Sequence, residues 1–339
     1  MRTSGSATSG CASRVSRLGA LLLTLVLHPG SMRVTASVSE APSPSIPVLS
    51  TEWVTTLGPA TPSGFFRFAA CDDGSVIAYS APATWYRIDP TGQITIAAEF
   101  WPLAGTRSVD CSSGAVHVLR YDGAFEAVVL DATTLTESRR VRLPSTDMPL
   151  AGLKVLGSGA WILSGGMTGG VAAPLADDGR IGAALGMFLP RPGRGNGNKS
   201  IVTPLFQRSG DSGVIHVQTQ DYTVAEFDQS GELRRVWRRD DDDFSRSRVP
   251  LLPGRVVEDE SIIGCAMRPD GSLVVQVNKR REHTGQSYVE RVSPDYRVAE
   301  QWALPRKGML FGAGPNGALY FAYASFDGLL VFKANAPLL

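Results

Sequence analysis

The chain has 339 residues, enough for one large domain or two, and 43% of them are apolar while 19% are charged. This composition is typical of a globular protein and excludes a disordered chain. The 33 basic and 32 acidic residues leave a net charge of +1, so nothing in the overall charge points to nucleic acid or to an anionic membrane as a partner. The 36 glycines and 22 prolines indicate a chain that turns often.

The first segment predicts export. Three arginines precede an apolar run of ten residues at 18–27, which is too short to span a bilayer but suits the core of a signal peptide. We expect residues 1–36 to be the signal peptide, cut after Ala36; the alternative is a short uncleaved anchor. The mature chain is then expected to be periplasmic or extracellular and to have no membrane span, since no other apolar run is long enough.

A linker and a repeat follow. Residues 37–50 are rich in proline and serine, which predicts an extended linker. From residue 51 onward, a tight polar turn closes on glycine and leads into a short strand rich in β-branched or aromatic residues, as at 71–79. The motif recurs six times, at 40 to 58 residues' spacing, close to the period of a four-stranded propeller blade. Its glycines are Gly74, Gly114, Gly159, Gly213, Gly271 and Gly317.

A second turn, built on aspartate, precedes the last strand of most repeats. Its aspartates are Asp89, Asp131, Asp177, Asp228 and Asp295. Each repeat therefore predicts four strands, and no stretch after residue 50 has a sustained helical period. We predict an all-β fold in which residues 51–339 form a single six-bladed β-propeller of four-stranded antiparallel blades.

The two ends of this domain predict how the ring closes. The sixth repeat supplies only three strands, whereas residues 51–57 form a strand outside any repeat. We expect strand 51–57 to pair into the last blade, because an open ring would expose a sheet edge. The predicted blades are 65–102, 105–144, 150–190, 201–239, 260–305, and 308–335 with 51–57.

Two insertions interrupt the repeat. Residues 191–199 are basic and glycine-rich, and residues 234–255 contain four consecutive aspartates between arginines. Loops on a rigid scaffold often carry specificity. Consecutive carboxylates can bind a hard cation, but neighbours on an extended chain point in opposite directions, so we favour a solvated loop. The aspartates are Asp240, Asp241, Asp242 and Asp243.

The cysteines and histidines predict no metal centre and no cofactor. The mature chain keeps Cys71, Cys111 and Cys265, with no CxxC pair and no Cys/His cluster. They are either three buried apolar residues or one disulfide with a free thiol. His117 and His216 each follow a repeat glycine by three residues in blades that are not adjacent, which predicts packing between blades.

The innermost strands hold the candidate ligand-binding residues, which are Arg67, Arg107 and Asp110. Arg67 and Arg107 each lie seven residues before their repeat glycine, so the same register places them at one height on adjacent blades. Two guanidinium groups at one height would attract an anion or a carboxylate. The alternative is that they pair with a neighbouring acid such as Asp110.

The turns with their strand-forming flanks, such as those at 88–94 and 269–275, resemble the NHL-repeat and TolB-like group of six-bladed propellers. The resemblance covers residues 51–335, and the group includes sensory domains, interaction modules and some hydrolases. Its gluconolactonase-like branch implies an axial divalent cation held by one Glu, two Asn and one Asp. Here residues 65–71 lack the expected Glu-Gly-Pro, and the mature chain has no Asn before Asn196, so that metal site is not carried over.

Two functions follow. The sequence contains no nucleophile elbow, P-loop or dinucleotide motif, so catalytic residues are unknown. We expect a monomeric, non-catalytic binding or scaffold propeller that engages a protein, peptide or glycan through one face and its inserted loops. The alternative is a hydrolase or lyase, lactonase-like, with its site in the axial funnel. Carboxylates or histidines that converge on the axis would favour the enzyme. A face lined by aromatic side chains would favour the binding propeller.

Overall fold

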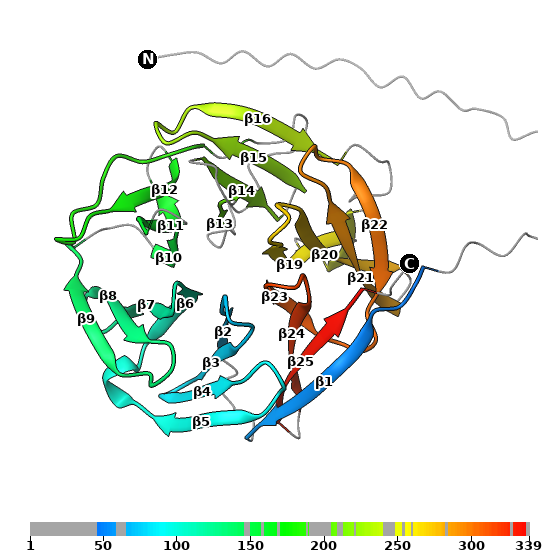
Figure 1. Cartoon of the computed structure of the whole chain (residues 1–339). Coiled ribbons are helices and arrows are strands. Elements are labelled where there is room, and N and C mark those ends of the chain that lie inside the picture. The colour runs from blue at the N-terminus through cyan, green and yellow to red at the C-terminus, as the bar shows by residue number, and fades with distance from the viewer. Residues whose placement is uncertain are drawn as a thin grey trace, which may run out of the picture. The chain divides into compact units, whose positions relative to one another are not determined.

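The repeats fold into sheets arranged around a central axis, as the view along that axis shows (Figure 1). The computed structural model describes residues 46–339 except for 59–65, 146–149, 157–158, 168–169, 188, 190–204, 209–212, 220–221, 240–247, 253–254, 259, 282–283, 326–327 and 337–339. The predicted signal peptide, most of the linker, and the four aspartates of the insertion lie outside the described residues. The fold is a six-bladed β-propeller, and the regular helix in the described part is one 3-10 turn, η1 (Trp101–Leu103).

The first two blades are regular four-stranded antiparallel sheets. Blade one consists of β2 (Phe66–Ala70), β3 (Val76–Ser80), β4 (Thr84–Ile88) and β5 (Ile94–Glu99). Blade two consists of β6 (Thr106–Ser112), β7 (Ala115–Tyr121), β8 (Phe125–Asp131) and β9 (Glu137–Arg142).

The fourth and fifth blades are also four-stranded. Blade four consists of β13 (Leu205–Phe206), β14 (Val214–Gln218), β15 (Thr223–Phe227) and β16 (Leu233–Arg238). Blade five consists of β19 (Glu260–Met267), β20 (Leu273–Arg281), β21 (Thr284–Val292) and β22 (Val298–Ala303). The strand positions match the blade boundaries that the glycine spacing predicts.

The third blade departs from the predicted pattern. It has three regular strands, β10 (Leu150–Val155), β11 (Trp161–Met167) and β12 (Gly170–Leu175). The segment that should form its fourth strand instead makes single bridges to β12, at Ile181 and at Leu185. The sequence there, IGAALG, supplies two glycines and two alanines, which pack poorly as an outer strand.

The last blade closes the ring. It consists of β1 (Ser50–Leu57), β25 (Gly328–Asn335), β24 (Leu319–Ser325) and β23 (Met309–Ala313), with β1 antiparallel to β25. The predicted closure by the N-terminal strand is confirmed by this pairing. The residues just before β1 also lie against the ring, since the Leu49 amide donates to the Ala303 carbonyl at 3.0 Å and Leu49 is buried.

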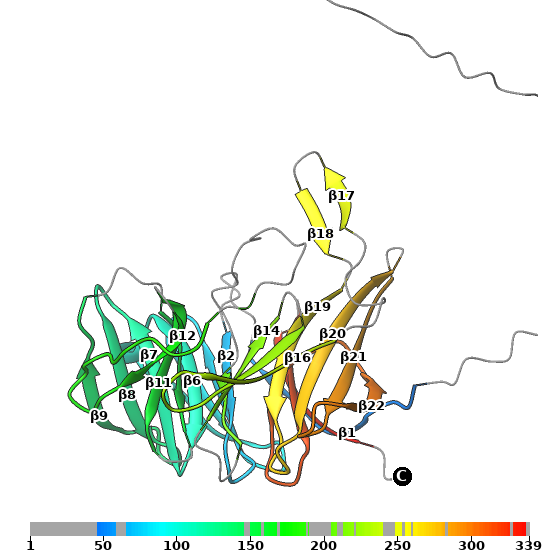
Figure 2. The same cartoon turned by 90° about the horizontal axis from the view of Figure 1, so that it is seen from above.

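The insertion between blades four and five contains a hairpin that the sequence does not predict. Strands β17 (Arg248–Leu252) and β18 (Arg255–Glu258) pair with each other and with no blade. The hairpin lies in the connection from the outermost strand β16 to the innermost strand β19. Figure 2 draws it projecting from the face of the ring at which β19 begins. This face of the ring is called the insertion face below.

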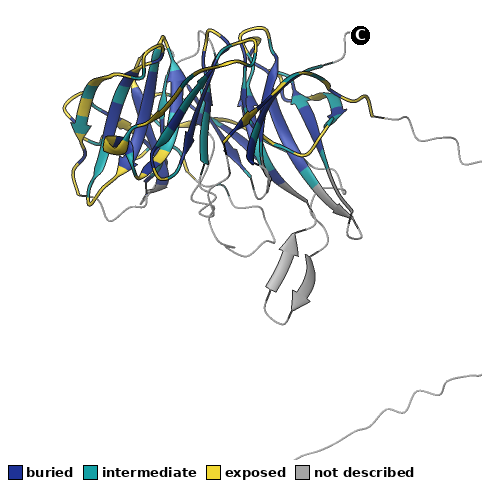
Figure 3. Cartoon of the chain, turned by 90° about the horizontal axis from the view of Figure 1, so that it is seen from below, coloured by how far each residue is buried: buried dark blue, intermediate teal, exposed yellow. Residues whose placement is uncertain are grey.

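The core is divided among the junctions between blades. Buried apolar side chains of the described residues form a cluster at each junction, and Figure 3 shows the buried positions along the inner strands of the ring. One cluster joins Leu57 and Val331 of the last blade to Val76 and Ile88 of the first. The two ends of the ring are therefore sealed by packing as well as by strand pairing.

The two kinds of turn form as the sequence predicts. Gly74 and Gly271 adopt φ of 82° and 76°, a region that favours glycine. In the aspartate turns the carboxylate accepts backbone amides; Asp89 accepts those of Thr91 and Gln93 at 2.9 Å each. In the second and fifth repeats Leu135 and Tyr296 take the positive φ that glycine takes elsewhere.

Candidate ligand site in the axial channel

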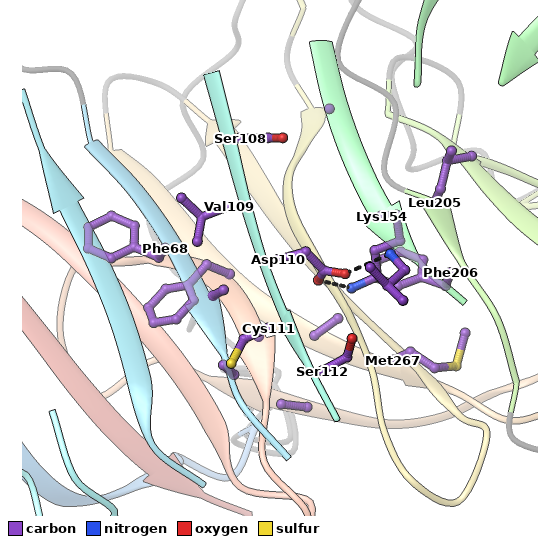
Figure 4. Close-up of a pocket in the computed structure, with 18 of the residues that line it drawn as sticks. Phe68, Ser108, Val109, Asp110, Cys111, Ser112, Lys154, Leu205, Phe206 and Met267 are labelled. Carbon is purple, nitrogen blue, oxygen red and sulfur yellow. Dashed lines mark hydrogen bonds and ion pairs between the residues drawn. The ribbon is translucent and has the colours of Figure 1, made fainter. Parts of the chain in front are cut away.

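A cavity of about 860 Å³ runs along the axis and is lined by the innermost strands of all six blades. This volume lies within the range of small-molecule pockets in proteins. The close-up in Figure 4 shows part of its wall, with Phe68 and Val109 on one side and Phe206 and Met267 on the other.

The innermost strands of the first three blades run in the same direction, so the channel has two distinct ends. Pairs of residues at equal register lie side by side: the Ser108 hydroxyl accepts the Leu153 amide, and Asp110 accepts the Val155 amide, both at 2.9 Å. The entry end of the channel lies on the insertion face, where each of these innermost strands begins. At the turn end each strand leads into its glycine turn.

Arg67 and Arg107 lie together at the entry end, where their equal register predicts them. Arg67 Nε donates to the Arg107 carbonyl, and Arg67 Nη1 donates to the Phe66 carbonyl at 2.8 Å. These bonds hold the half-buried Arg67 guanidinium in place, and burial, followed by the charge of Arg107, lowers the pKa of Arg67. Arg107 is exposed, and its guanidinium carbon lies 5.9 Å from the centre of the Tyr121 ring.

Asp110 does not pair with these arginines but with Lys154 on the neighbouring blade. The Lys154 ammonium donates to one carboxylate oxygen at 2.5 Å, while the Val155 amide donates to the other, as the dashed lines in Figure 4 show. The Asp110 side chain is buried, whereas 37% of the Lys154 side chain is exposed to the channel. The alternative pairing of Arg67 and Arg107 with Asp110 is therefore not the one that forms.

An aromatic wall stands beside the arginines. Phe68 stacks on Phe66 at 6.4 Å within blade one, and on Phe311 of blade six at 4.9 Å. Met309, at the start of β23, lines the same end and is 47% exposed. Side chains alternate along β2, so the two phenylalanines face blade six while Arg67 between them faces blade two. The entry end is thus basic on one side and apolar on the other.

Asp72, Arg208 and Arg268 also line the channel, and each has a charged or hydrogen-bonding neighbour within the protein. Arg208 pairs with Glu226 and lies 5.0 Å from the Tyr296 ring centre. Asp72 accepts the Ser113 amide at 2.7 Å. These groups lie toward the turn end, where each innermost strand approaches its turn. The two arginines at the entry end therefore give that end its positive charge.

The turn end is tied by a disulfide between Cys71 and Cys111, which joins the ends of the innermost strands of blades one and two. Of the two possibilities that the sequence leaves open, one disulfide with a free thiol is the one that forms. Among the cysteines that the structure describes, Cys265 is free, and burial raises its pKa well above the usual value for a thiol.

His117 and His216 are buried, and His117 packs against a neighbouring blade as predicted. Its ring makes an edge contact with Trp161 of blade three at 5.9 Å. Among the residues that the structure describes, no three His, Cys, Asp or Glu side chains converge closely enough to hold a metal ion. No helix in that part of the chain has the length and apolar character needed to cross a membrane.

Lys154 and the aromatic wall are the channel features that sequence reasoning missed. Phe68 and Phe311 both lie six residues before their repeat glycines, so the register that identified the arginines also places these two rings at one height. Lys154 has no such signal, because its partner Asp110 belongs to another repeat and to a different position within it.

No family model matches the chain, and no curated protein matches its sequence. Among solved structures, a streptogramin B lyase structure is similar over 84% of this chain and 98% of its own, with 14% identity and a TM-score of 0.51. A member of the DUF4221 family from Bacteroides vulgatus is similar over 85% of this chain and 97% of its own, with 9% identity and a TM-score of 0.55. At such identities the likeness concerns the fold alone. The class that fold and comparisons together define is the six-bladed β-propeller.

Proposed function

We propose that this protein is a binding propeller, which takes a protein, peptide or glycan ligand at the insertion face and into the entry end of its channel. The observation that carries the proposal is the two-sided entry end, with the Phe66, Phe68 and Phe311 wall opposite Arg67 and Arg107. Pockets that bind ligands are mostly apolar and contain a few placed polar groups, and this arrangement fits that description.

We further propose that the chain is exported through its N-terminal signal peptide and that its repeats are of the NHL or TolB-like type. The Cys71–Cys111 disulfide supports export, because such bonds persist in oxidising compartments and are rare in the cytosol. The apolar run at 18–27 supports it independently.

The test is a capture experiment with a channel-filling variant. The protein would be immobilised and offered a panel of peptides and glycans, with bound compounds identified by mass spectrometry. Ala151 lies on the innermost strand β10 and lines the channel, so Ala151→Trp should abolish capture. Ala97, exposed on the outermost strand β5, provides the matched control, and Ala97→Trp should capture normally.

The outcomes separate the two candidate functions. Capture by both tryptophan variants would place the ligand outside the channel and contradict the proposal. Recovery of compounds whose mass has changed would favour the alternative, a hydrolase or lyase with its site in the channel.

A further inference from the structure

The entry end of the channel combines two chemical demands on a ligand. One side presents the exposed Arg107 beside Arg67, and the other presents the stacked rings of Phe68 and Phe311 with the half-exposed Met309. A purely polar ligand would leave the aromatic wall exposed to water. A purely apolar ligand would remove water from the arginines and offer them no hydrogen bond in return. The complementary ligand has an anionic group joined to an apolar body.

The arginines favour a carboxylate as the anionic group. Arg67 is held by its bonds to the Arg107 and Phe66 carbonyls, so it is preorganised and supplies fixed positive charge. Within the described residues Arg107 forms no ion pair; its guanidinium rests near the Tyr121 ring. The planar fork of one exposed guanidinium matches the two oxygens of one carboxylate, and cation–ring contact leaves its edge available.

The channel below the arginines favours an apolar body of limited size. Val109, Phe206 and Met267 continue the apolar lining past the aromatic wall, as Figure 4 shows, and the whole cavity holds about 860 Å³. The Lys154–Asp110 pair deeper on the wall is neutral as a pair and already hydrogen-bonded, so it does not compete for the carboxylate. An aromatic or branched aliphatic side chain would fit this lining.

We propose that the entry end binds a carboxylate attached to an apolar or aromatic body, with the carboxylate on Arg107 and Arg67 and the body against Phe68 and Phe311. The inference rests on the proposed binding function and specifies the ligand chemistry of that same site. The carboxylate belongs either to a free small acid or to the C-terminus of a peptide that ends in an apolar residue, since both present the same groups.

The experiment is a calorimetric titration of the full chain with four probes. N-acetylphenylalanine is compared with its amide, and a decapeptide ending in phenylalanine is compared with the same peptide amidated at its C-terminus. The free carboxylates should bind roughly tenfold or more tightly than the amides, which is the usual range for hydrogen bonds to charged groups. Added salt should lower the binding affinity of the two acids and leave that of the two amides unchanged.

Variants then assign the contacts. Arg107→Gln should remove the preference for acid over amide without lowering the melting temperature, because Arg107 is exposed. Arg180→Gln is the matched control: Arg180 is 83% exposed in a turn of blade three, paired with Asp178, and its loss should change nothing. Phe68→Leu should weaken the binding of acid and amide by the same factor. Phe311→Leu should have the same effect, and it provides a second test of the aromatic wall if Phe68→Leu destabilises the fold.

Binding of the small acid identifies a free carboxylate as the source, and binding of the peptide alone identifies a C-terminus; either result supports the proposal. Equal affinity for acid and amide overturns it, and so does the failure of all four probes to bind. Neither of these results bears on the capture experiment with Ala151→Trp, so the binding function is tested separately.

Discussion

At the scale of single residues, His216 is a titratable group that the ring holds in one charge state. Its side chain is fully buried on β14, and neither ring nitrogen has a hydrogen-bond partner within the described structure. Burial lowers the pKa of His216 from 6.5 to about 4, because the cation would have to leave water without compensation. The folded protein therefore holds this histidine neutral at physiological pH.

The first prediction concerns pH. Because the folded pKa lies below the unfolded one, the unfolded chain binds the proton first, and stability falls as pH is lowered from 6.5 to about 4. The loss should reach about 3 kcal/mol at the lower limit and then level off. Urea unfolding at a series of pH values measures it, and His216→Leu should flatten the profile.

Three other groups bear on the same experiment. Burial also lowers the pKa of His117, so the variant should retain a smaller slope in the same window. Hydrogen bonds in the turns lower the pKa of Asp89 and Asp228. Their contribution to the stability of the fold is complete above pH 3.8, the ordinary pKa of aspartate, and is lost only as the pH falls through the lowered values. A profile that His216→Leu leaves as steep as before would contradict the assignment.

Tyr296 shows how one residue can depart from its local pattern. It takes a φ of 64° where other turns have glycine, a cost that contacts elsewhere must offset. Its hydroxyl donates to Glu226 at 2.5 Å, and Arg208 and Arg235 lie over its ring at 5.0 and 4.5 Å. The pKa of Tyr296 is raised by burial and by the neighbouring carboxylate, which keeps the hydroxyl protonated as a donor.

At the scale of elements, the innermost strands of blades one and two are joined by a covalent bond and by a side-chain hydrogen bond. The disulfide links residues 40 positions apart at the turn end, and Arg67 links the same two strands at the entry end. The two arginines of the candidate ligand site therefore lie on a pair of blades that is linked covalently.

The second prediction is the cost of removing that disulfide. Closing a loop of about this length in the unfolded chain contributes about 4 kcal/mol in the chain-entropy model. The double variant Cys71→Ser, Cys111→Ser should lower the free energy of unfolding by roughly that amount, measured by urea titration. Reduced wild-type protein should behave like the variant, and a denaturation midpoint that reductant leaves unchanged would show that the bond does not form in solution.

At the scale of the whole molecule, stability depends on closing the ring. Strand β1 pairs with β25 over most of its length, and Leu57, buried to 1% exposure, packs on residues of both the first and the last blade. A propeller blade that loses a neighbour exposes its apolar face, so the blades on both sides of the seam depend on β1.

The third prediction follows. Leu57→Ala should cost about 2 to 5 kcal/mol, as for other buried leucines, and should speed hydrogen exchange in blade one as well as in blade six. Val54, on the same strand but 39% exposed, is the control, and Val54→Ala should have a small effect. Faster exchange confined to β1 itself would show that the strand frays without opening the ring.

What the sequence determined by itself is the architecture. Six glycine turns with strand-forming flanks predict six repeats of a sheet, because turn chemistry acts within one repeat. A last repeat with three strands and a lone first strand predict closure of the ring, because an unpaired sheet edge is unfavourable. The register of Arg67 and Arg107 also followed, since both count from their own turns.

Only the tertiary structure decided the chemistry of the channel. The Cys71–Cys111 bond, the Lys154–Asp110 pair and the Phe68–Phe311 stack each join different blades. Strand alternation predicts which side chains share a face of one strand, but contacts between adjacent blades depend on bulges and on how far each strand is shifted along its neighbour.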